Sequence, residues 1–300
     1  MATLREIRRR IKSVKNIAKV TGALEAVSRS KVYRAQAQAL ATRYYARAAL
    51  RILNDVAQFR DSSITHPLLD ERETIKNISI VLISSDRGLA GPYNTNVVAL
   101  ARKFELEKGV PAQYITIGRK GRDLVVRRGC NVVAEFSDLP ATPSILDITA
   151  ITRAAVDDFL NHVVDEVYIA YTSYNNMIVQ DATIQRLLPL KPETSLKTGD
   201  GSAANTSASG LKPVYEFEPD PQSILDEIMP RFTELQLYQA VLESIASEHA
   251  ARMVAMRNAT ENANAVVEDL TLSYNNARQM AITSEILDIV GGANALEQSQ

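Results

Sequence analysis

The sequence predicts an α/β protein with a long antiparallel coiled coil, in which a middle α/β domain lies between two terminal helices that form a shaft. Three observations predict this architecture. All eleven prolines fall between Pro67 and Pro230. Apolar residues recur at steps of three and four along both ends of the chain, which is the pattern of one helix face. The middle alternates strand-like and helix-like segments.

The first arm is predicted to be one long helix. Residues 1–66 contain a single glycine, Gly22, and no proline. Sixty helical residues would reach about 90 Å at 1.5 Å per residue. The predicted apolar face consists of Leu4, Ile7, Ile11, Val14, Ile17, Val20, Leu24 and Val27.

The last arm is predicted to be a second long helix with a sustained repeat of 3.5 residues, which implies a left-handed supercoil with a partner helix. The obvious partner is the first arm, folded back antiparallel. The many alanines of this seam would let the two helices approach closely. Stepping by four and three from Ile228 lands on Phe232, Leu235, Gln239, Leu242, Ala246, His249, Met253, Met256, Thr260, Ala263, Val267, Leu270, Tyr274, Ala277 and Ala281.

The middle segment is predicted to form a partly parallel, Rossmann-like α/β domain, because strands and helices alternate. Residues 191–213 are rich in Gly, Ser, Thr, Ala and Lys and are predicted to form a mobile surface loop. The domain boundaries are predicted at 1–66, 67–220 and 221–300. The predicted strands are 78–84, 113–117, 131–136, 166–174 and 178–188, and the predicted helices are 94–108, 120–128 and 145–162.

Composition excludes several classes of protein. The longest apolar runs are five residues, whereas a membrane-spanning helix needs about 20. One cysteine, Cys130, excludes an internal disulfide, and three scattered histidines argue against a metal site. Residues 1–60 carry 14 Lys and Arg against three acids, whereas the remainder carries 20 against 32. The basic arm therefore predicts an anionic partner.

The candidate motifs favour binding over catalysis. The glycines in the loop 85–91 follow a strand, but their spacing is not that of a nucleotide-binding loop. A tight turn that presents Asp86 and Arg87 to a partner is the better interpretation. The basic cluster 118–122 is predicted to be a solvated turn rather than an anion site. His249 lies on the predicted seam without a second ligand nearby, so it is predicted to set the register of the coil.

Three classes of function remain open on the residues alone. The middle domain could be a nucleotide-dependent enzyme, although the glycine spacing speaks against it. The basic first helix could bind nucleic acid, with steep salt dependence. An acidic protein surface would serve equally well as its partner.

Several stretches of the chain are distinctive as motifs. Near the start are LREIRRRIKSVKNIAKVT from Leu4 and SSDRGLAG from Ser84. Near the end are ARMVAMRNATENA from Ala251, YNNARQMAITSEI from Tyr274 and IVGGANAL from Ile289, and this last block is highly specific. Through these motifs the chain closely resembles the gamma subunits of F-type ATP synthases from nearly one end to the other.

The resemblance implies a non-catalytic rotor. In this family the two terminal helices form a coiled coil on the axis of a hexamer of three alpha and three beta subunits. The α/β domain sits at the foot, on the ring of c subunits and beside the epsilon subunit. Proton flow turns ring and shaft, and the shaft drives the catalytic beta subunits through their nucleotide-binding states. No cofactor, metal ion or nucleic acid is implied.

The resemblance also implies which residues contact partners. The C-terminal helix would offer a polar edge to a beta-subunit loop and an apolar tip to a collar at the top of the hexamer. Loop 85–91 and the basic helix would face beta subunits. These contacts are Arg278, Gln279 and Thr283 for the edge, Ile286, Ile289 and Leu296 for the tip, Asp86 and Arg87 for the loop, and Arg8, Arg9 and Lys12 for the helix.

The implied location is the cytoplasmic face of a bacterial plasma membrane, where the chain would be peripheral. The alternative is the corresponding membrane of a mitochondrion or chloroplast. A transit peptide is disfavoured because the helical pattern starts at Leu4 and Glu6 is out of place in such a peptide.

Overall fold

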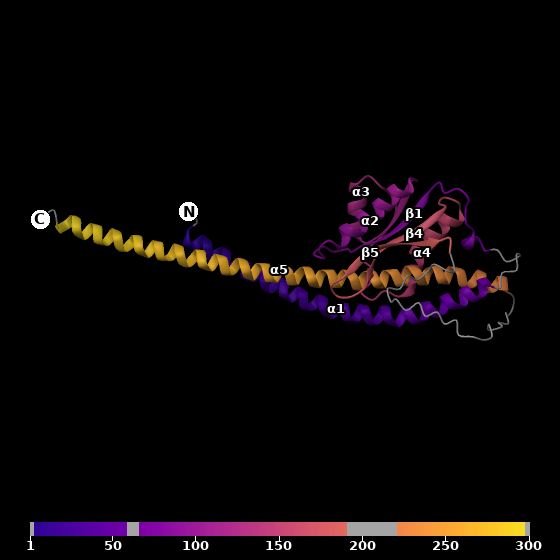
Figure 1. The fold of residues 1–300 in the computed structure, drawn as a ribbon, viewed down its shortest axis with the longest axis horizontal. Helices are drawn as coiled ribbons and strands as arrows, with labels where there is room; N and C mark the ends of the chain where they lie inside the picture. Colours follow the sequence, from indigo (N-terminus) through magenta and orange to yellow (C-terminus); the bar gives the residue numbers. More distant parts are fainter. Residues whose placement is uncertain (1–2, 59–65, 191–220, 298–300) are drawn as a thin grey trace. The chain divides into compact units, whose positions relative to one another are not determined.

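A computed structural model describes residues 3–58, 66–190 and 221–297, with side chains described for 3–42, 66–190, 223 and 225–291. It divides into two compact units (Figure 1). The coil unit comprises residues 1–28 and 253–300, and the sheet unit comprises residues 29–252. The predicted mobile loop 191–213 lies outside the described residues. The predicted boundaries after residues 66 and 220 stay predictions.

Two long helices contribute to both units. Helix α1 spans Leu4–Gln58 and helix α5 spans Pro221–Glu297. Pro230 lies inside α5, although proline normally interrupts a helix because it lacks an N–H and its ring clashes with the preceding turn. The side chains of Leu225, Met229 and Phe232 are buried around it. This apolar packing stabilises the helix on both sides of the proline.

In the coil unit, α1 and α5 run antiparallel. The hydroxyl oxygens of Thr21 and Thr260 are 2.7 Å apart. Nearby, a hydrogen bond with Glu261 raises the pKa of Arg257, and the charges of Glu261 and Glu25 add to this effect. Residue numbers therefore rise along α1 as they fall along α5, which confirms the predicted antiparallel pairing.

The predicted apolar face of α1 is wrong at three positions beyond Val14, whereas Leu24 is half-buried. Ile17, Val20 and Val27 were expected at the seam, but their side chains are 52%, 59% and 53% exposed. The structure follows a strict repeat of 3.5 residues from Ile7 and buries smaller residues. Those buried instead are Ala18, Thr21 and Ser28. Small side chains at these positions permit close approach of the helices. Ile17, Val20 and Val27 form an exposed apolar stripe on α1, called here the outer stripe.

The seam of α5 follows the prediction more closely. The burial of its side chains fades along the helix: Met256 and Ala263 are buried, Tyr274 and Ala277 are half-buried, and Ala281 is exposed. The register explains this change, because Thr260 already pairs with Thr21 and α1 begins only at Leu4. The last turns of α5 have no partner along α1.

The sheet unit contains a five-stranded sheet in the order β3-β2-β1-β4-β5. Neighbouring strands are parallel except that β5 is antiparallel to β4. The predicted partly parallel α/β domain is confirmed, with element bounds within a few residues of those expected. The elements are a short 3-10 helix at Pro67–Leu69, β1 Ile78–Ile83, α2 Tyr93–Lys108, β2 Ala112–Ile117, α3 Arg119–Arg127, β3 Asn131–Phe136, α4 Ile145–Leu160, β4 Glu166–Tyr174 and β5 Gln180–Leu188.

Helices cover both faces of this sheet (Figure 1), which explains why β1 is apolar at nearly every position. Alternate side chains of β1 point to opposite faces. Ile78, Ile80 and Leu82 pack with residues of α2 and α3. Val81 and Ile83 pack with residues of α4 and of the first part of α5. The sheet therefore binds α5 through an apolar core.

Candidate partner-binding sites

Loop 85–91 follows β1 at the point where the sheet order changes direction, because β1 has β2 on one side and β4 on the other. Proteins with open α/β sheets bind nucleotides outside such a switch point. Here side chains of α5 occupy that region. The hydroxyl groups of Tyr93 and Ser244 are 2.6 Å apart, and the Ser247 hydroxyl donates to the carbonyl of Thr172 at 3.0 Å. The chain thus uses the switch point for internal packing.

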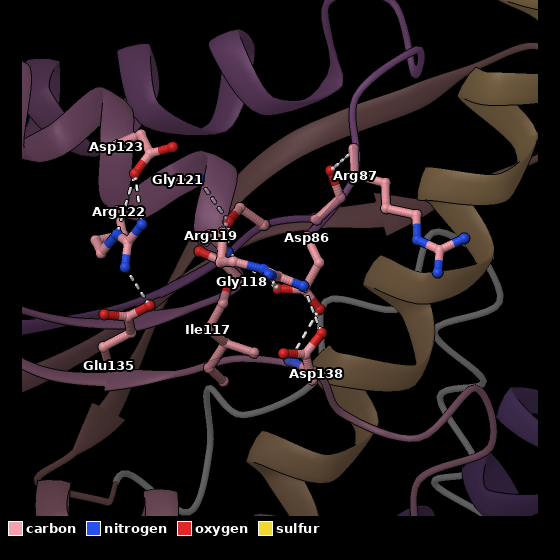
Figure 2. A network of polar contacts seen from close by, with 12 residues as sticks. Asp86, Arg87, Ile117, Gly118, Arg119, Gly121, Arg122, Asp123, Glu135 and Asp138 are labelled. Atoms are coloured by element: carbon pink, nitrogen blue, oxygen red, sulfur yellow. Dashed lines mark hydrogen bonds and ion pairs between the residues drawn. The ribbon is translucent and has the colours of Figure 1, made fainter.

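Asp86, expected at a partner surface, holds three loops together (Figure 2). Its carboxylate accepts the backbone N–H of Arg119 at 3.1 Å and that of Asp138 at 3.0 Å. It also lies 3.7 Å from Nε of Arg119. The loops after β1, β2 and β3 are therefore joined at one carboxylate. Partner contact by Asp86 stays a prediction.

Arg87 differs from its neighbour. Its side chain is exposed and points away from the Asp86 network in Figure 2. Within the described part of the chain, the Arg87 guanidinium makes no hydrogen bond or ion pair, in contrast to its carbonyl, which accepts from the Ser85 hydroxyl at 2.6 Å. Leu89, with φ of 65°, is 66% exposed. The loop thus presents a cation and an apolar side chain.

The basic cluster 118–122 packs against β1. The Ser84 hydroxyl donates to the Ile117 carbonyl and accepts the Gly121 N–H, both at 2.9 Å, so it occupies the start of α3. A Cβ atom at Gly118 would lie 2.4 Å from the Ser84 carbonyl oxygen. Arg122 pairs with Glu135 at 2.6 Å. The glycines serve close packing, and neighbouring acids neutralise the arginines.

The predicted contacts on the long helices are all exposed where the structure describes them. Residues 278–291 of α5 are exposed without interruption. This run includes Arg278, Gln279 and Thr283, together with Ile286 and Ile289, which are 55% and 67% exposed. The side chain of Leu296 lies outside the described residues. The basic contacts Arg8, Arg9 and Lys12 are likewise exposed on α1.

A shallow hollow of about 290 Å³ lies on the surface of α1, and Ile17 and Val20 of the outer stripe line it in part. Its lining combines apolar and small polar side chains: Ser13, Asn16, Ile17, Val20 and Thr21. An exposed apolar stripe with a hollow beside it is typical of a surface that a partner covers.

Sequence patterns did not single out Arg252, which joins α5 to loop 85–91. Its guanidinium donates to the Gly88 carbonyl at 3.2 Å and pairs with Glu248 at 2.6 Å. His249 Nδ1 lies 3.2 Å from Arg252 Nη1. The pKa of His249 falls to about 4 because burial disfavours the charged ring, and Arg252 and Lys31 add to the effect.

Acid is expected to destabilise the isolated chain through His249. Because the folded-state pKa lies below the ordinary 6.5, the contribution to stability is complete above that pH and is lost as pH falls towards about 4. The loss reaches about 3 kcal/mol. Urea unfolding of wild type and of His249→Asn, each measured at pH 6.5 and at about pH 4, tests this loss. The difference in unfolding free energy between the two proteins should change between the two pH values. Exposed His162, replaced by Asn, is the control, and a pH-independent difference for His249→Asn contradicts the assignment.

Metal-binding groups and membrane-spanning helices are two features that the described ranges 3–58, 66–190 and 221–297 could reveal. No group of three or more His, Cys, Asp or Glu residues there could hold a metal ion. The helices of the same ranges include none that is long and apolar enough to cross a bilayer. The fold and its exposed helix end define a class of protein in which the long helices of an α/β domain continue into an antiparallel coiled coil with an exposed end.

Comparison with known proteins identifies the family. Residues 3–296 match the family model described as ATP synthase. The chain is 44% identical over 303 residues to the ATP synthase gamma chain of Roseiflexus sp. (strain RS-1), covering 99% of this chain and 100% of that one. It is 43% identical over 301 residues to that of Chloroflexus aurantiacus (strain ATCC 29366 / DSM 635 / J-10-fl), with 99% of each covered. The chain belongs to the ATP synthase gamma chain family.

Solved structures share the fold. One is a chain of the Euglena gracilis mitochondrial ATP synthase containing OSCP, F1 and c-ring, with a TM-score of 0.68 and 20% identity over 99% of this chain and 95% of that one. A chain from the Tetrahymena thermophila mitochondrial central stalk and c-ring has a TM-score of 0.59 and 20% identity, covering 80% of this chain and 99% of that one.

Proposed function

We propose that this chain is the central rotor shaft of an F-type ATP synthase and couples proton-driven rotation of the c ring to ATP synthesis and hydrolysis at the beta subunits. It carries torque and performs no chemistry itself. Family membership supports the proposal. The single observation that carries it is the end of α5, where residues 278–291 are exposed and include six large apolar side chains: Met280, Ile282, Ile286, Leu287, Ile289 and Val290. An exposed apolar surface of this kind marks a site at which a partner binds.

The proposed partners are three alpha and three beta subunits around one copy of the chain, together with the epsilon subunit and the c ring. The apolar end of α5, from Ile286 to Leu296, would turn inside a collar of the hexamer. Arg278, Gln279 and Thr283 would meet a beta-subunit loop, and Asp86 with Arg87 would face the beta subunits from the sheet unit. The exposed cations Arg8, Arg9 and Lys12 suit the acidic surface that this arrangement supplies.

The proposed location is peripheral to the membrane, on the cytoplasmic face of a bacterial plasma membrane. The bacterial relatives support a bacterial setting. Attachment would come from the c ring, since the described helices include none suited to span a bilayer.

Replacing Arg278 and Gln279 together by Ala is expected to lower ATP synthesis by about tenfold in membranes that contain the assembled enzyme. A tenfold loss corresponds to about 1.4 kcal/mol, which is close to the value of a single hydrogen bond to a charged group. Both side chains are exposed, so thermal unfolding of the isolated chain should be unchanged. The matched control is Lys103→Ala with Glu107→Ala, an exposed pair on α2. Unchanged synthesis in the Arg278/Gln279 variant would contradict these contacts.

A further inference from the structure

The Arg252 guanidinium reaches the main chain of loop 85–91 from α5. Its Nη2 donates to the Gly88 carbonyl at 3.2 Å and to the Arg87 carbonyl at 3.4 Å, and its Nε donates to the Gly88 carbonyl at 3.4 Å. Glu248 Oε1 accepts from the same guanidinium at 2.6 Å. The side chains of Arg252 and Glu248 are only 13% and 17% exposed. We call these two residues and the two carbonyls the loop clamp.

The loop needs such support because its backbone is strained. Leu89 has a φ of 65°, a region that bulky residues rarely adopt and that costs about 1–3 kcal/mol. On the sheet side the loop is already fixed, since Ser85 N–H donates to Asn94 Oδ1 at 3.0 Å and Asp86 binds two backbone N–H groups. The carbonyls of Arg87 and Gly88 are bound from α5. The loop is therefore held on two sides around its exposed tip.

The clamp depends on the pair rather than on either charge alone. Burial raises the pKa of Glu248, and Arg252 opposes this effect. A lone buried carboxylate or guanidinium would be costly, whereas the hydrogen-bonded pair compensates both charges. The chain offers a matched control in Glu227 and Arg231, which have the same order and spacing on α5, a contact of 2.9 Å, and side chains that are 70% and 75% exposed.

We propose that Glu248 and Arg252 are positioning residues that fix loop 85–91 to α5, so that Arg87 and Leu89 meet a carboxylate-bearing partner segment in one orientation as the shaft turns. The inference rests on the proposed function as a rotor. It adds a mechanical link that neither the glycine pattern of the loop nor the heptad pattern of the helix reveals. Arg87 makes the contact, and the clamp acts through it.

The clamp itself is tested on the isolated full chain by amide hydrogen exchange. In Arg252→Met, the hydrogen-bonded amides that hold the loop, those of Ser85, Tyr93 and Asp138, should exchange on the order of tenfold faster, because the loop loses the hydrogen bonds to its Arg87 and Gly88 carbonyls. Amides of β1 should keep their protection. Glu248→Gln keeps an acceptor for Arg252 and should give a smaller increase, whereas Arg231→Met should give none. Unchanged exchange in Arg252→Met overturns the clamp, whether or not the chain assembles with partners.

Positioning is tested in the assembled enzyme by the ratio of proton pumping to ATP hydrolysis. Arg252→Met should retain hydrolysis and lower this ratio by about threefold, with Arg252→Lys partly restoring it, because lysine keeps a donor for the carbonyls. The exposed control Arg231→Met should keep the wild-type ratio. A wild-type ratio in Arg252→Met, despite faster loop exchange, overturns the positioning role. A wild-type chain that fails to assemble contradicts the rotor proposal instead and leaves the exchange result standing.

Discussion

Replacing Gly118 by alanine is expected to lower the free energy of unfolding by about 3 kcal/mol or more, the sum of overpacking and backbone strain. Gly118 has a φ of 93°, and an added Cβ would lie 2.4 Å from the Ser84 carbonyl oxygen. The obstacle is main chain directly after β1, which a side-chain rotation cannot relieve. Urea unfolding of the isolated chain, followed by circular dichroism, measures the loss.

Gly109 provides the matched control for this effect. It has a φ of 68°, but an added Cβ there meets nothing within 4 Å. Gly109→Ala therefore introduces backbone strain without a steric clash. It is expected to lower the free energy of unfolding by about 1 kcal/mol. Equal losses at the two glycines would show that close packing of α3 against β1 contributes nothing.

The second large effect is expected at Arg72, which fixes the segment before β1 to the loop before β4. Its Nη1 lies 2.7 Å from Asp165 Oδ1, and its Nη2 donates to the Phe159 carbonyl at 2.6 Å. The guanidinium also lies 4.7 Å from the centre of the Phe159 ring. Both charged side chains are largely buried, at 17% and 14% exposure.

Arg72→Met should therefore cost about 3–5 kcal/mol, because it leaves the Asp165 carboxylate without its cation. Burial disfavours the charged form of Asp165, yet hydrogen bonds from Arg72 and from the N–H groups of Lys76 and Asn77 lower its pKa overall. Lys103→Met, which breaks an exposed pair with Glu107, is the control and should cost less than about 1 kcal/mol. If Arg72→Met lowered the free energy of unfolding by as little as Lys103→Met does, the buried pair would add no stability.

The sequence was sufficient for the architecture because each element has a strong local signal. The strand Ile78–Ile83 is apolar at every position except Ser79, and Pro, Gly and polar residues mark the ends of the neighbouring elements. The coil was harder, because two phases of the repeat fit α1 equally well beyond Val14. Hydrophobicity favoured Ile17 and Val20, whereas close packing of the helices selected Ala18 and Thr21.

For the candidate sites, the sequence predicted which side chains are exposed but not which contacts form inside the molecule. The exposure of Arg278 and Ile286 follows from their place beyond the start of the partner helix. The internal hydrogen bonds of Asp86 could not be predicted from the sequence, because the N–H groups that it binds belong to loops more than thirty residues further along the chain. Arg252 was likewise hidden, because it lies 164 residues from the Gly88 carbonyl that it binds.

The most direct test of the rotor proposal is the mass of the complex formed with cognate alpha and beta subunits, measured by size-exclusion chromatography with light scattering. The proposal predicts a stable complex with one copy of this chain for three alpha–beta pairs, because a single asymmetric shaft fits inside a pseudo-threefold ring. A chain that elutes alone, or as a symmetric dimer, would contradict it and would assign the exposed end of α5 to self-association.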